Sequence, residues 1–434
     1  MQEYISLLRR NDNYRHLWLG NVVSLLGDWF NLIAAAELIT ELSNEGVAIS
    51  YLFLARFLPL FAFSPLAGVL ADRYDRKMLM VISDVLRAVV VFGFLIVGVT
   101  GQIWLFYLLT VAQFALSALF TPARSAVVAM VVDRKELVTA NALDSFTWST
   151  MLALGALLGG IVAAVFGAET AFVLDGFTFL LSAWFISRIV LKAVSLVPGE
   201  ESRGGWLDFV DGFRYLWTRP YLLILSLIKA TGSLVWGAVN VLEISFADHV
   251  FPLTMFPLAD ALRIEDGGTA TLGIIYLVSG LGTGLGPLLM RRILGSRPPR
   301  LILGATIGMI FVSLGIWGLG AAPTFGLFLL ATAVRTIGSG TMWVFSAVLL
   351  QIVVPDRYRG RVFAFEFAML TLTQSVSTLL AGVFQDAPGW GLNQTAWLFA
   401  GMGVVFSFGW MSFYTWSRRN ASDARVEVFW TAGD

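Results

Sequence analysis

Several ionisable side chains of this sequence lie inside long apolar runs, where burying a charge is costly. At about 1.5 Å of rise per helical residue, four of them come out near the middle of a bilayer: Asp28, Arg56, Lys229 and Arg335. An ionised side chain at that depth costs on the order of 3 kcal/mol unless it is paired or hydrated. We therefore expect these residues to line a polar cavity, together with Gln113 and Gln374 at similar depth.

Asp28 and Arg56 are the pair with the clearest chemistry. Asp28 lies roughly 20 Å from the cytoplasmic start of its helix, and Arg56 lies about 14 Å below the outer start of the next one. On adjacent helices the two side chains could pair. Burial disfavours the charged form of a carboxyl group, and a neighbouring arginine favours it. Asp28 is thus the candidate for a proton-coupling carboxylate, and Arg56 is its expected partner.

Other ionisable residues come out nearer the ends of the apolar runs. The cytoplasmic group comprises Asp84, Arg87, Arg124, Asp144 and Glu366. The outer group comprises Glu37, Asp175 and Glu243. For these shallower residues we favour structural ion pairs over a role in transport.

The composition identifies the elements that carry these residues. Of the 434 residues, 57% are apolar and 13% are charged, whereas a soluble domain carries about 25% charged residues. A bilayer core needs about 20 apolar residues per helix. Such runs cover roughly residues 15–42, 47–71, 77–99, 103–131, 142–166, 170–193, 221–247, 269–290, 301–320, 324–353, 362–384 and 394–416. These runs predict an all-α polytopic membrane protein with twelve transmembrane helices.

The basic residues predict the orientation of these helices. If the N-terminus is cytoplasmic, every inside segment contains Arg or Lys, and the outside segments contain only Arg263. This is the positive-inside pattern. It predicts that both termini lie on the cytoplasmic side of the membrane.

The longest inside loop divides the chain into two halves. We predict an N-terminal six-helix bundle over 1–194, a linker over 195–220 and a C-terminal six-helix bundle over 221–434. Within the linker, WLDFVDGFRYLW has apolar residues at helical spacing. This stripe fits a helix lying in the headgroup interface, or equally a helix packed on protein. The apolar outer segment 248–268 has no predicted role.

Several functional classes are excluded or disfavoured. The chain has no Cys, and its two histidines, His16 and His249, are far apart, so we expect no metal and no cofactor. GLGTGLG (280–286) lies inside an apolar run without a preceding strand, and its GxxxG spacing favours close helix packing over nucleotide binding. No nucleophile–base constellation is evident, so an enzyme is not expected. Zero formal net charge implies no nucleic-acid partner.

The stretch GVLADRYDRK (68–77) resembles the loop between helices 2 and 3 of the major facilitator superfamily. Its matching residues are Gly68, Leu70, Asp72, Arg73, Arg76 and Lys77, and Asp75 stands where glycine is commonest. The segments NYRHLWLGNVVSLLGDW, FTPARSAVVAMVV and VPDRYRGRVFA resemble its twelve-helix drug:proton antiporter branch, which contains macrolide and enterobactin exporters. In helix 5, GALLGG has Ala156 where that branch has proline, which weakens the case for antiport.

The resemblance implies two six-helix bundles with rocking alternating access around a central cavity. It further implies a monomeric, proton-driven antiporter in the inner membrane that exports small amphipathic molecules. An uncoupled facilitator or a lipid-type flippase on the same fold is the alternative, and a non-transporting membrane sensor is a remote one. An excess of cations in the cavity suggests anionic or zwitterionic substrates.

The resemblance also implies a role for the charged loop. Asp72, at the C-terminal end of helix 2, opposes that helix's dipole and needs a partner. The implied partner is the N-terminal end of helix 11, just after Arg361, whose N–H groups favour an anion. We expect Gly68, Asp72, Arg73, Arg76, Lys77 and Arg361 to form a cytoplasmic gate.

Overall fold

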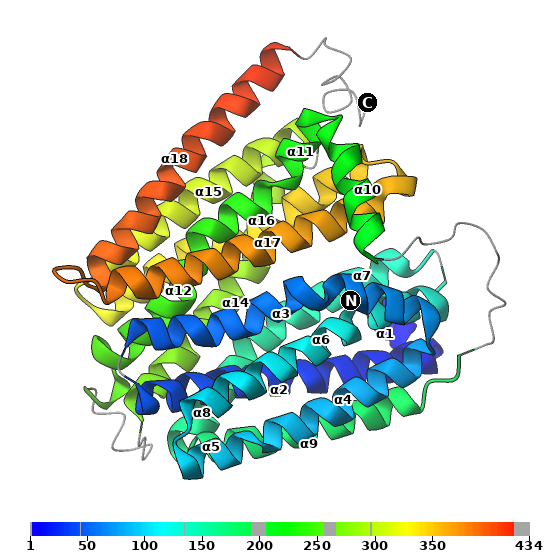
Figure 1. The fold of residues 1–434 in the computed structure, drawn as a ribbon. Coiled ribbons are helices and arrows are strands. Elements are labelled where there is room, and N and C mark those ends of the chain that lie inside the picture. The colour runs from blue at the N-terminus through cyan, green and yellow to red at the C-terminus, as the bar shows by residue number, and fades with distance from the viewer. Residues whose placement is uncertain are drawn as a thin grey trace. The chain divides into compact units, whose positions relative to one another are not determined.

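Helices make up the described parts of the protein (Figure 1). The computed structural model describes residues 2–43, 45–133, 135–191, 205–255, 266–295 and 297–420. The first half contains α1 (Gln2–Arg10), α2 (Asp12–Leu42), α3 (Gly46–Arg73), α4 (Arg76–Phe92), α5 (Phe94–Thr100), α6 (Ile103–Val131), α7 (Leu137–Thr150), the π-helical turn η1 (Met151–Gly155), α8 (Ala156–Phe166) and α9 (Ala168–Ser187). The second contains α10 (Gly205–Trp217), α11 (Pro220–Ser226), α12 (Ile228–His249), the 3-10 turn η2 (Leu253–Met255), α14 (Gly267–Leu294), α15 (Pro298–Ala321), α16 (Phe325–Val353), α17 (Asp356–Gln385) and α18 (Leu392–Arg419).

Twelve of these segments are long and apolar enough to cross a membrane, which confirms the predicted number. Three spans are composite. The span Arg76–Thr100 joins α4 and α5 at Gly93, Thr139–Phe166 contains the π-helical turn η1, and Pro220–His249 joins α11 and α12 at Leu227. Hydropathy alone did not predict these interruptions, because a change of helix type leaves the apolar composition unchanged.

Local capping explains where several helices begin. The Asn11 side chain accepts a hydrogen bond from the Tyr14 backbone N–H (2.9 Å) and starts α2. The Asp75 side chain accepts one from the Met78 backbone N–H (2.7 Å) and starts α4. A carboxylate at this position satisfies a backbone donor that would otherwise lack a helical partner. The departure of Asp75 from the family pattern is therefore a helix cap.

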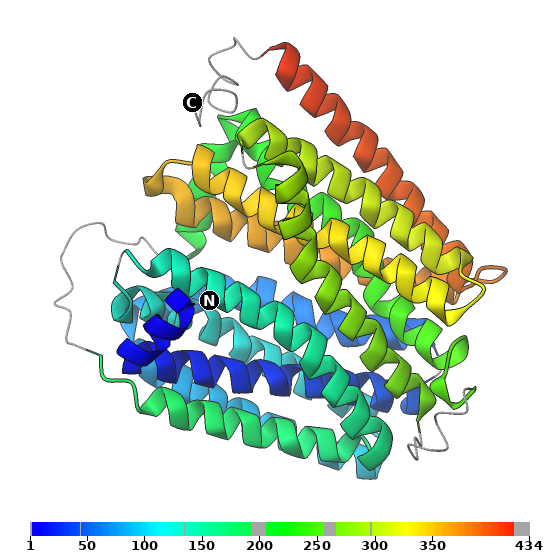
Figure 2. The ribbon, with the colours of Figure 1, turned by 180° about the vertical axis from the view of Figure 1, so that it is seen from behind.

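The chain forms two compact units. The first unit comprises residues 1–44, 58–207 and 252–277, and the second comprises 45–57, 208–251 and 278–434. In the first, α9 packs against α2 and α4, and α4 packs against α6 (Figures 1 and 2). In the second, α15 packs against α16 and α18, and α12 packs against α17. The predicted division at 195–220 stays a prediction.

Glycines set the closest helix contacts within each unit. In the second unit, a Cβ on Gly286 or Gly340 would meet the backbone of the facing helix, α16 or α14, at 2.4 Å. This confirms the packing interpretation of GLGTGLG. In the first unit, a Cβ on Gly160 of α8 would lie 2.9 Å from the Gly273 Cα of α14. Small residues of this kind let two membrane helices approach closely.

The linker does contain the predicted helix, α10. Leu216 is fully buried, and the Phe213 ring packs against Phe365 at 5.7 Å between centroids. Val210 and Trp217 remain exposed. The helix therefore combines a packed side with apolar side chains that are available to a membrane surface.

Candidate functional site: buried charge in each unit

In the first unit, α4 contributes a buried ion pair between Asp84 and Arg87. Their i,i+3 spacing puts both side chains on one helix face. Ser182 on α9 donates to Asp84 Oδ2 (2.7 Å), and the Arg87 guanidinium lies over the rings of Phe120 and Phe179, at 4.7 and 4.3 Å from their centroids. The pair therefore fixes α4 against α9, as expected of a structural ion pair.

Asp175 on α9 lies beside this pair and is fully buried. The Thr178 hydroxyl lies 3.3 Å from Asp175 Oδ1, and the Asn31 side chain of α2 lies close to the carboxyl group. Among the described residues, no hydrogen-bond partner meets Asp175 Oδ2. Gly27 permits the close approach of α2, because a Cβ there would collide with Thr178 and Asp175.

Asp28 on α2 lies within electrostatic range of both Asp84 and Asp175. We call these three carboxylates and Arg87 the aspartate cluster. Depth along the sequence placed Asp28 near the midplane but assigned Asp175 to the outer end, so the sequence did not indicate that these two carboxylates lie close together. The role of Asp28 stays a prediction. Arg56 is buried and belongs to the second unit, so its pairing with Asp28 stays a prediction.

Two buried ion pairs lie among the described residues of the second unit. In the first of them, Lys229 Nζ of α12 lies 3.1 Å from Glu366 Oε2 of α17. The Lys229 ammonium also lies 4.5 Å from the centroid of the Trp343 ring on α16, a cation–π distance. Lys229 is 6% exposed and Glu366 is 2% exposed. The pair thus connects three helices of this unit.

In the second of them, Arg335 of α16 pairs with Glu243 of α12. The Arg335 guanidinium also donates to Ser279 Oγ on α14 (3.3 Å). Gly315 of α15 makes room for the arginine, since a Cβ there would lie 2.5 Å from the Arg335 Cβ. We call the two ion pairs of this unit the paired sites. The sequence indicated the membrane depth of all four residues. It did not indicate which carboxylate pairs with which cation.

The two predicted glutamines differ in their surroundings. Gln113 of α6 is fully buried, and neither amide atom meets a hydrogen-bond partner among the described residues. Gln374 of α17 is half-buried, and its backbone carbonyl oxygen lies against Gly237 of α12. Two unsatisfied amide atoms in a buried position are costly, so Gln113 is the better candidate to meet a polar ligand.

The charged loop between α3 and α4 is partly fixed within the first unit. Lys77 Nζ donates to the Ile189 carbonyl (2.8 Å) just beyond α9, and Arg76 contacts Met130 Sδ of α6 (3.2 Å). Arg73 is exposed, and Arg361 of α17 is half-buried. Gly68 and Asp72 lie in α3, but their side chains lie outside the described residues. The cytoplasmic gate therefore stays a prediction.

The opposite end of α3 makes a contact that the sequence did not indicate. Within the second unit, Asp386 accepts hydrogen bonds from the backbone N–H groups of Gly46 (2.9 Å) and Val47 (2.8 Å). One turn further along α3, Ser50 Oγ donates a hydrogen bond to the Thr378 carbonyl (2.7 Å). An anion at a helix N-terminus is stabilised by the free N–H groups and the helix dipole. This carboxylate therefore joins α3 to α17.

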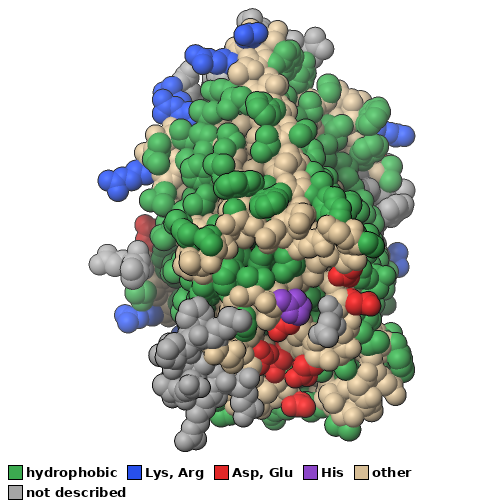
Figure 3. Space-filling view, turned by 90° about the vertical axis from the view of Figure 1, so that its left-hand side faces the viewer, with side chains coloured by type: hydrophobic (Ala, Val, Ile, Leu, Met, Phe, Trp, Pro, Cys, Tyr) green, Lys and Arg blue, Asp and Glu red, His purple; other side chains and the backbone are tan. Residues whose placement is uncertain are grey.

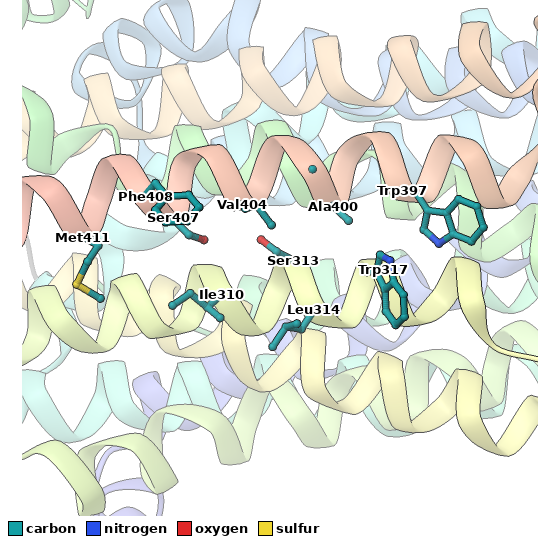
Figure 4. A pocket seen from close by; sticks show the side chains of 11 residues that line it. Ile310, Ser313, Leu314, Trp317, Trp397, Ala400, Val404, Ser407, Phe408 and Met411 are labelled. Atoms are coloured by element: carbon teal, nitrogen blue, oxygen red, sulfur yellow. The ribbon is translucent and has the colours of Figure 1, made fainter.

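A separate hollow of about 900 Å³ lies between α15 and α18 of the second unit (Figure 4). Its lining is uncharged and includes Trp317, Trp397 and Phe408, which are 57%, 43% and 72% exposed. Ser313 and Ser407 lie between the two helices. Exposed apolar side chains on membrane helices suit contact with lipid. This groove is thus distinct from the buried charges.

Comparison with known proteins gives the family. The sequence pattern of the Major Facilitator Superfamily matches residues 17–378. The putative bacilysin exporter BacE of Bacillus amyloliquefaciens is 25% identical over 375 residues, covering 86% of this chain and 89% of the relative. Macrolide efflux protein A of Streptococcus pyogenes is 24% identical over 381 residues, with the same two coverages, 86% and 89%.

Solved structures agree on the fold. The nucleoside transporter NupG superposes with a TM-score of 0.70 at 15% sequence identity, covering 93% of this chain and 99% of its own. A bacterial homologue of the human lysosomal transporter Spinster superposes with a TM-score of 0.68 at 15% identity, covering 94% and 96%. With twelve candidate membrane spans among the described residues and a family match over most of its length, the chain belongs to the Major Facilitator Superfamily and is a multi-pass membrane transporter, not an enzyme.

Proposed function

We propose that the protein is a proton-coupled antiporter that exports small amphipathic molecules from the cytoplasm by alternating access. The observation that carries the proton coupling is Asp175, a fully buried carboxylate with an oxygen that no described residue bonds. Together with Asp28 and Asp84 it makes a group of carboxylates around one arginine, Arg87. A buried carboxylate in such a group can exchange a proton whenever water reaches it.

In this proposal Asp28 is the proton-responsive carboxylate and Arg56 is its partner. Proton binding from the outside lowers the negative charge of the aspartate cluster, and proton release to the cytoplasm restores it. Substrate binding and protonation then favour opposite orientations of the transporter, which is the requirement for antiport. Asp175 extends the set of carboxylates that can hold the proton.

The proposed substrate cavity is lined by Gln113, Lys229, Arg335 and Gln374. The names of the relatives, a bacilysin exporter and a macrolide efflux protein, support antibiotic-like substrates. The two cations of this set would tolerate anionic or zwitterionic compounds. A thermal-shift screen with a macrolide, a dipeptide and a nucleoside as probes would select the transport substrate.

The coupling is tested in proteoliposomes that contain the full-length protein and the selected probe. An imposed pH gradient is expected to drive probe uptake, and Asp28→Asn is expected to reduce the gradient-driven part about tenfold, within the usual range of coupling between two ligands. Asp12→Asn, the same change at an exposed position of the same helix, is the matched control. Wild-type flux that ignores collapse of the gradient would favour an uncoupled facilitator or flippase, and an unimpaired Asp28→Asn would exclude Asp28.

We further propose a cytoplasmic gate at Gly68, Asp72, Arg73, Arg76, Lys77 and Arg361, a monomer in the inner membrane, and both termini in the cytoplasm. Lys77 and Arg76 hold the start of α4 within the first unit, which leaves Asp72 as the residue to test. Asp72→Asn is expected to slow transport about fivefold or more while probe binding changes less than twofold, since a gate changes the conformational equilibrium rather than the site. Equal loss of binding and transport would indicate a structural role.

A further inference from the structure

A cavity of about 270 Å³ in the first unit is lined by four carboxylates: Glu37, Glu41, Glu169 and Asp266. It lies where α2 and α8 end and α9 begins, on the predicted outer side. Its other lining residues are apolar or glycine. Figure 3 shows acidic side chains gathered on the face formed by these helix ends. Such a concentration of one charge attracts cations from solution.

Glu37 distinguishes this cavity from an ordinary acidic surface, because its carboxyl group is buried. Its side chain lines the cavity yet is only 7% exposed, and among the described residues its Oε2 meets no hydrogen-bond partner. Thr269 is the nearby hydroxyl, but it donates its one proton to Asp266 Oδ2 (2.6 Å). Thr269 therefore offers Glu37 a lone pair, which suits a carboxyl group that carries a proton.

Among the described residues, the elements packed around Glu37 contribute no cation to the cavity. Glu41 lies on its own helix, Glu169 lies on α9, and α5 and α8 contain no charged residue. Asp266 caps α14 through the backbone N–H groups of Gly268 (2.8 Å) and Thr269 (3.2 Å), so its charge has a structural use. The basic residue of α6, Arg124, pairs with Asp144 elsewhere in the unit (2.7 Å).

The donor groups of this cavity suit a proton better than a chelated metal. No group of three or more carboxylates or histidines in the described parts of the chain could hold a metal ion. Resting on the proposed proton coupling, we propose that the cavity is a vestibule in which Glu41 and Glu169 concentrate protons and Glu37 accepts them. A hydronium ion gives its proton to the Glu37 carboxylate, forming one O–H bond and leaving water.

The position of the vestibule connects it to the aspartate cluster. From Glu37 to Asp28 along α2 is about 14 Å, and from Glu169 to Asp175 along α9 is about 9 Å, at 1.5 Å per residue. The two helices pack against each other, and the Asn31 side chain of α2 lies close to Asp175 of α9. The α2–α9 interface thus links the vestibule to the buried carboxylates.

Infrared difference spectroscopy of the purified full-length protein, stepped in pH without substrate, tests the acceptor. The band of a protonated carboxyl group is expected to lose one component in Glu37→Gln and to keep it in Glu37→Asp, which retains a carboxyl group. Glu3→Gln, an exposed change on α1, is the matched control and is expected to leave the band unchanged. A band that is equal in Glu37→Gln and wild type would overturn the proposal.

A pH jump followed in the same band tests the two outer glutamates. The double variant Glu41→Gln/Glu169→Gln is expected to keep the Glu37 component but to slow its appearance about tenfold at low salt, the lower range of electrostatic focusing. Added salt should reduce the difference between this variant and wild type. If the Glu37 band appeared at the same rate in this variant and in wild type at low salt, Glu41 and Glu169 would not concentrate protons, and the vestibule would be ruled out.

A comparison of sodium chloride with choline chloride at equal ionic strength separates a proton from a metal cation. The band is expected to be the same in both salts, and its loss in sodium alone would identify a metal site and overturn the proposal. Because no substrate is present, this experiment is independent of transport. A Glu37 that titrates in a protein whose substrate flux ignores the pH gradient would contradict the proposed antiport and leave the proton site standing.

Discussion

The aspartate cluster and the paired sites place charge inside membrane helices in two different ways. In the paired sites of the second unit, two cations each have a carboxylate partner: Lys229 pairs with Glu366, and Arg335 pairs with Glu243. In the first unit Arg87 pairs with Asp84, and Asp175 has no such cation within ion-pair distance among the described residues. The paired sites are balanced within their unit, whereas the aspartate cluster contains a carboxylate that protonation would neutralise.

This difference separates two uses of a buried charge. A balanced pair is destabilised by the loss of either member, because the remaining charge stays buried without compensation. A carboxylate that can be neutralised by a proton tolerates replacement by an amide, but its chemistry is lost. Stability and coupling should therefore respond in opposite ways in the two units.

The largest effect on stability is expected at Arg335 and Glu243. Glu243→Met leaves the arginine buried and uncompensated, and should lower the free energy of unfolding by about 3–5 kcal/mol. The measurement is thermal or denaturant unfolding in detergent. The double variant Glu243→Met/Arg335→Met should recover most of the loss, since replacing both members by apolar groups is often neutral. If the single and double variants lost the same amount, the balanced-pair interpretation would be wrong.

An intermediate effect is expected from Ser182, which donates to Asp84 within the aspartate cluster. Ser182→Ala should cost about 1.5–3 kcal/mol of unfolding free energy, the range for a hydrogen bond to a charged group. The same unfolding assay measures it, with the exposed Ser187→Ala on α9 as control. If Ser182→Ala lowered the free energy of unfolding less than the control does, the Ser182 hydrogen bond would not stabilise Asp84, and Arg87 would be its stabilising partner.

The smallest effect on stability, with a large effect on function, is expected at Asp175. Asp175→Asn should change the free energy of unfolding by less than about 1 kcal/mol, because the amide reproduces the shape of a neutral carboxyl group. Gradient-driven flux in proteoliposomes should nevertheless fall about tenfold, the effect expected when coupling is lost. Strong destabilisation with intact coupling would place Asp175 with the structural pairs and abolish the contrast between the two units.

The sequence was sufficient for the spans and their number, because hydropathy over about 20 residues is set by the bilayer and not by the neighbouring helices. Structural ion pairs were expected for the cytoplasmic group without named partners, and Asp84 and Arg87 form one, since their three-residue spacing puts both on one helix face. The partners of Lys229 and Arg335 lie 137 and 92 residues away, and no spacing rule reaches that far. Asp175 was assigned to the outer end, since distance along one helix does not show what an adjacent helix presents.

The π-helical turn at Met151–Gly155 has a consequence for how this transporter could change through evolution. A π-helical turn contains one residue more than the α-helical turn that it replaces, and such turns occur frequently at functional sites. Because the extra residue is absorbed within that one turn, deleting it would restore a regular α-helix and keep the helix beyond it in the same rotational phase. Gly159 and Gly160 would then still face Phe30 and Gly273. A single-codon deletion at this turn could thus remove the irregular backbone while preserving the contact surface of α8.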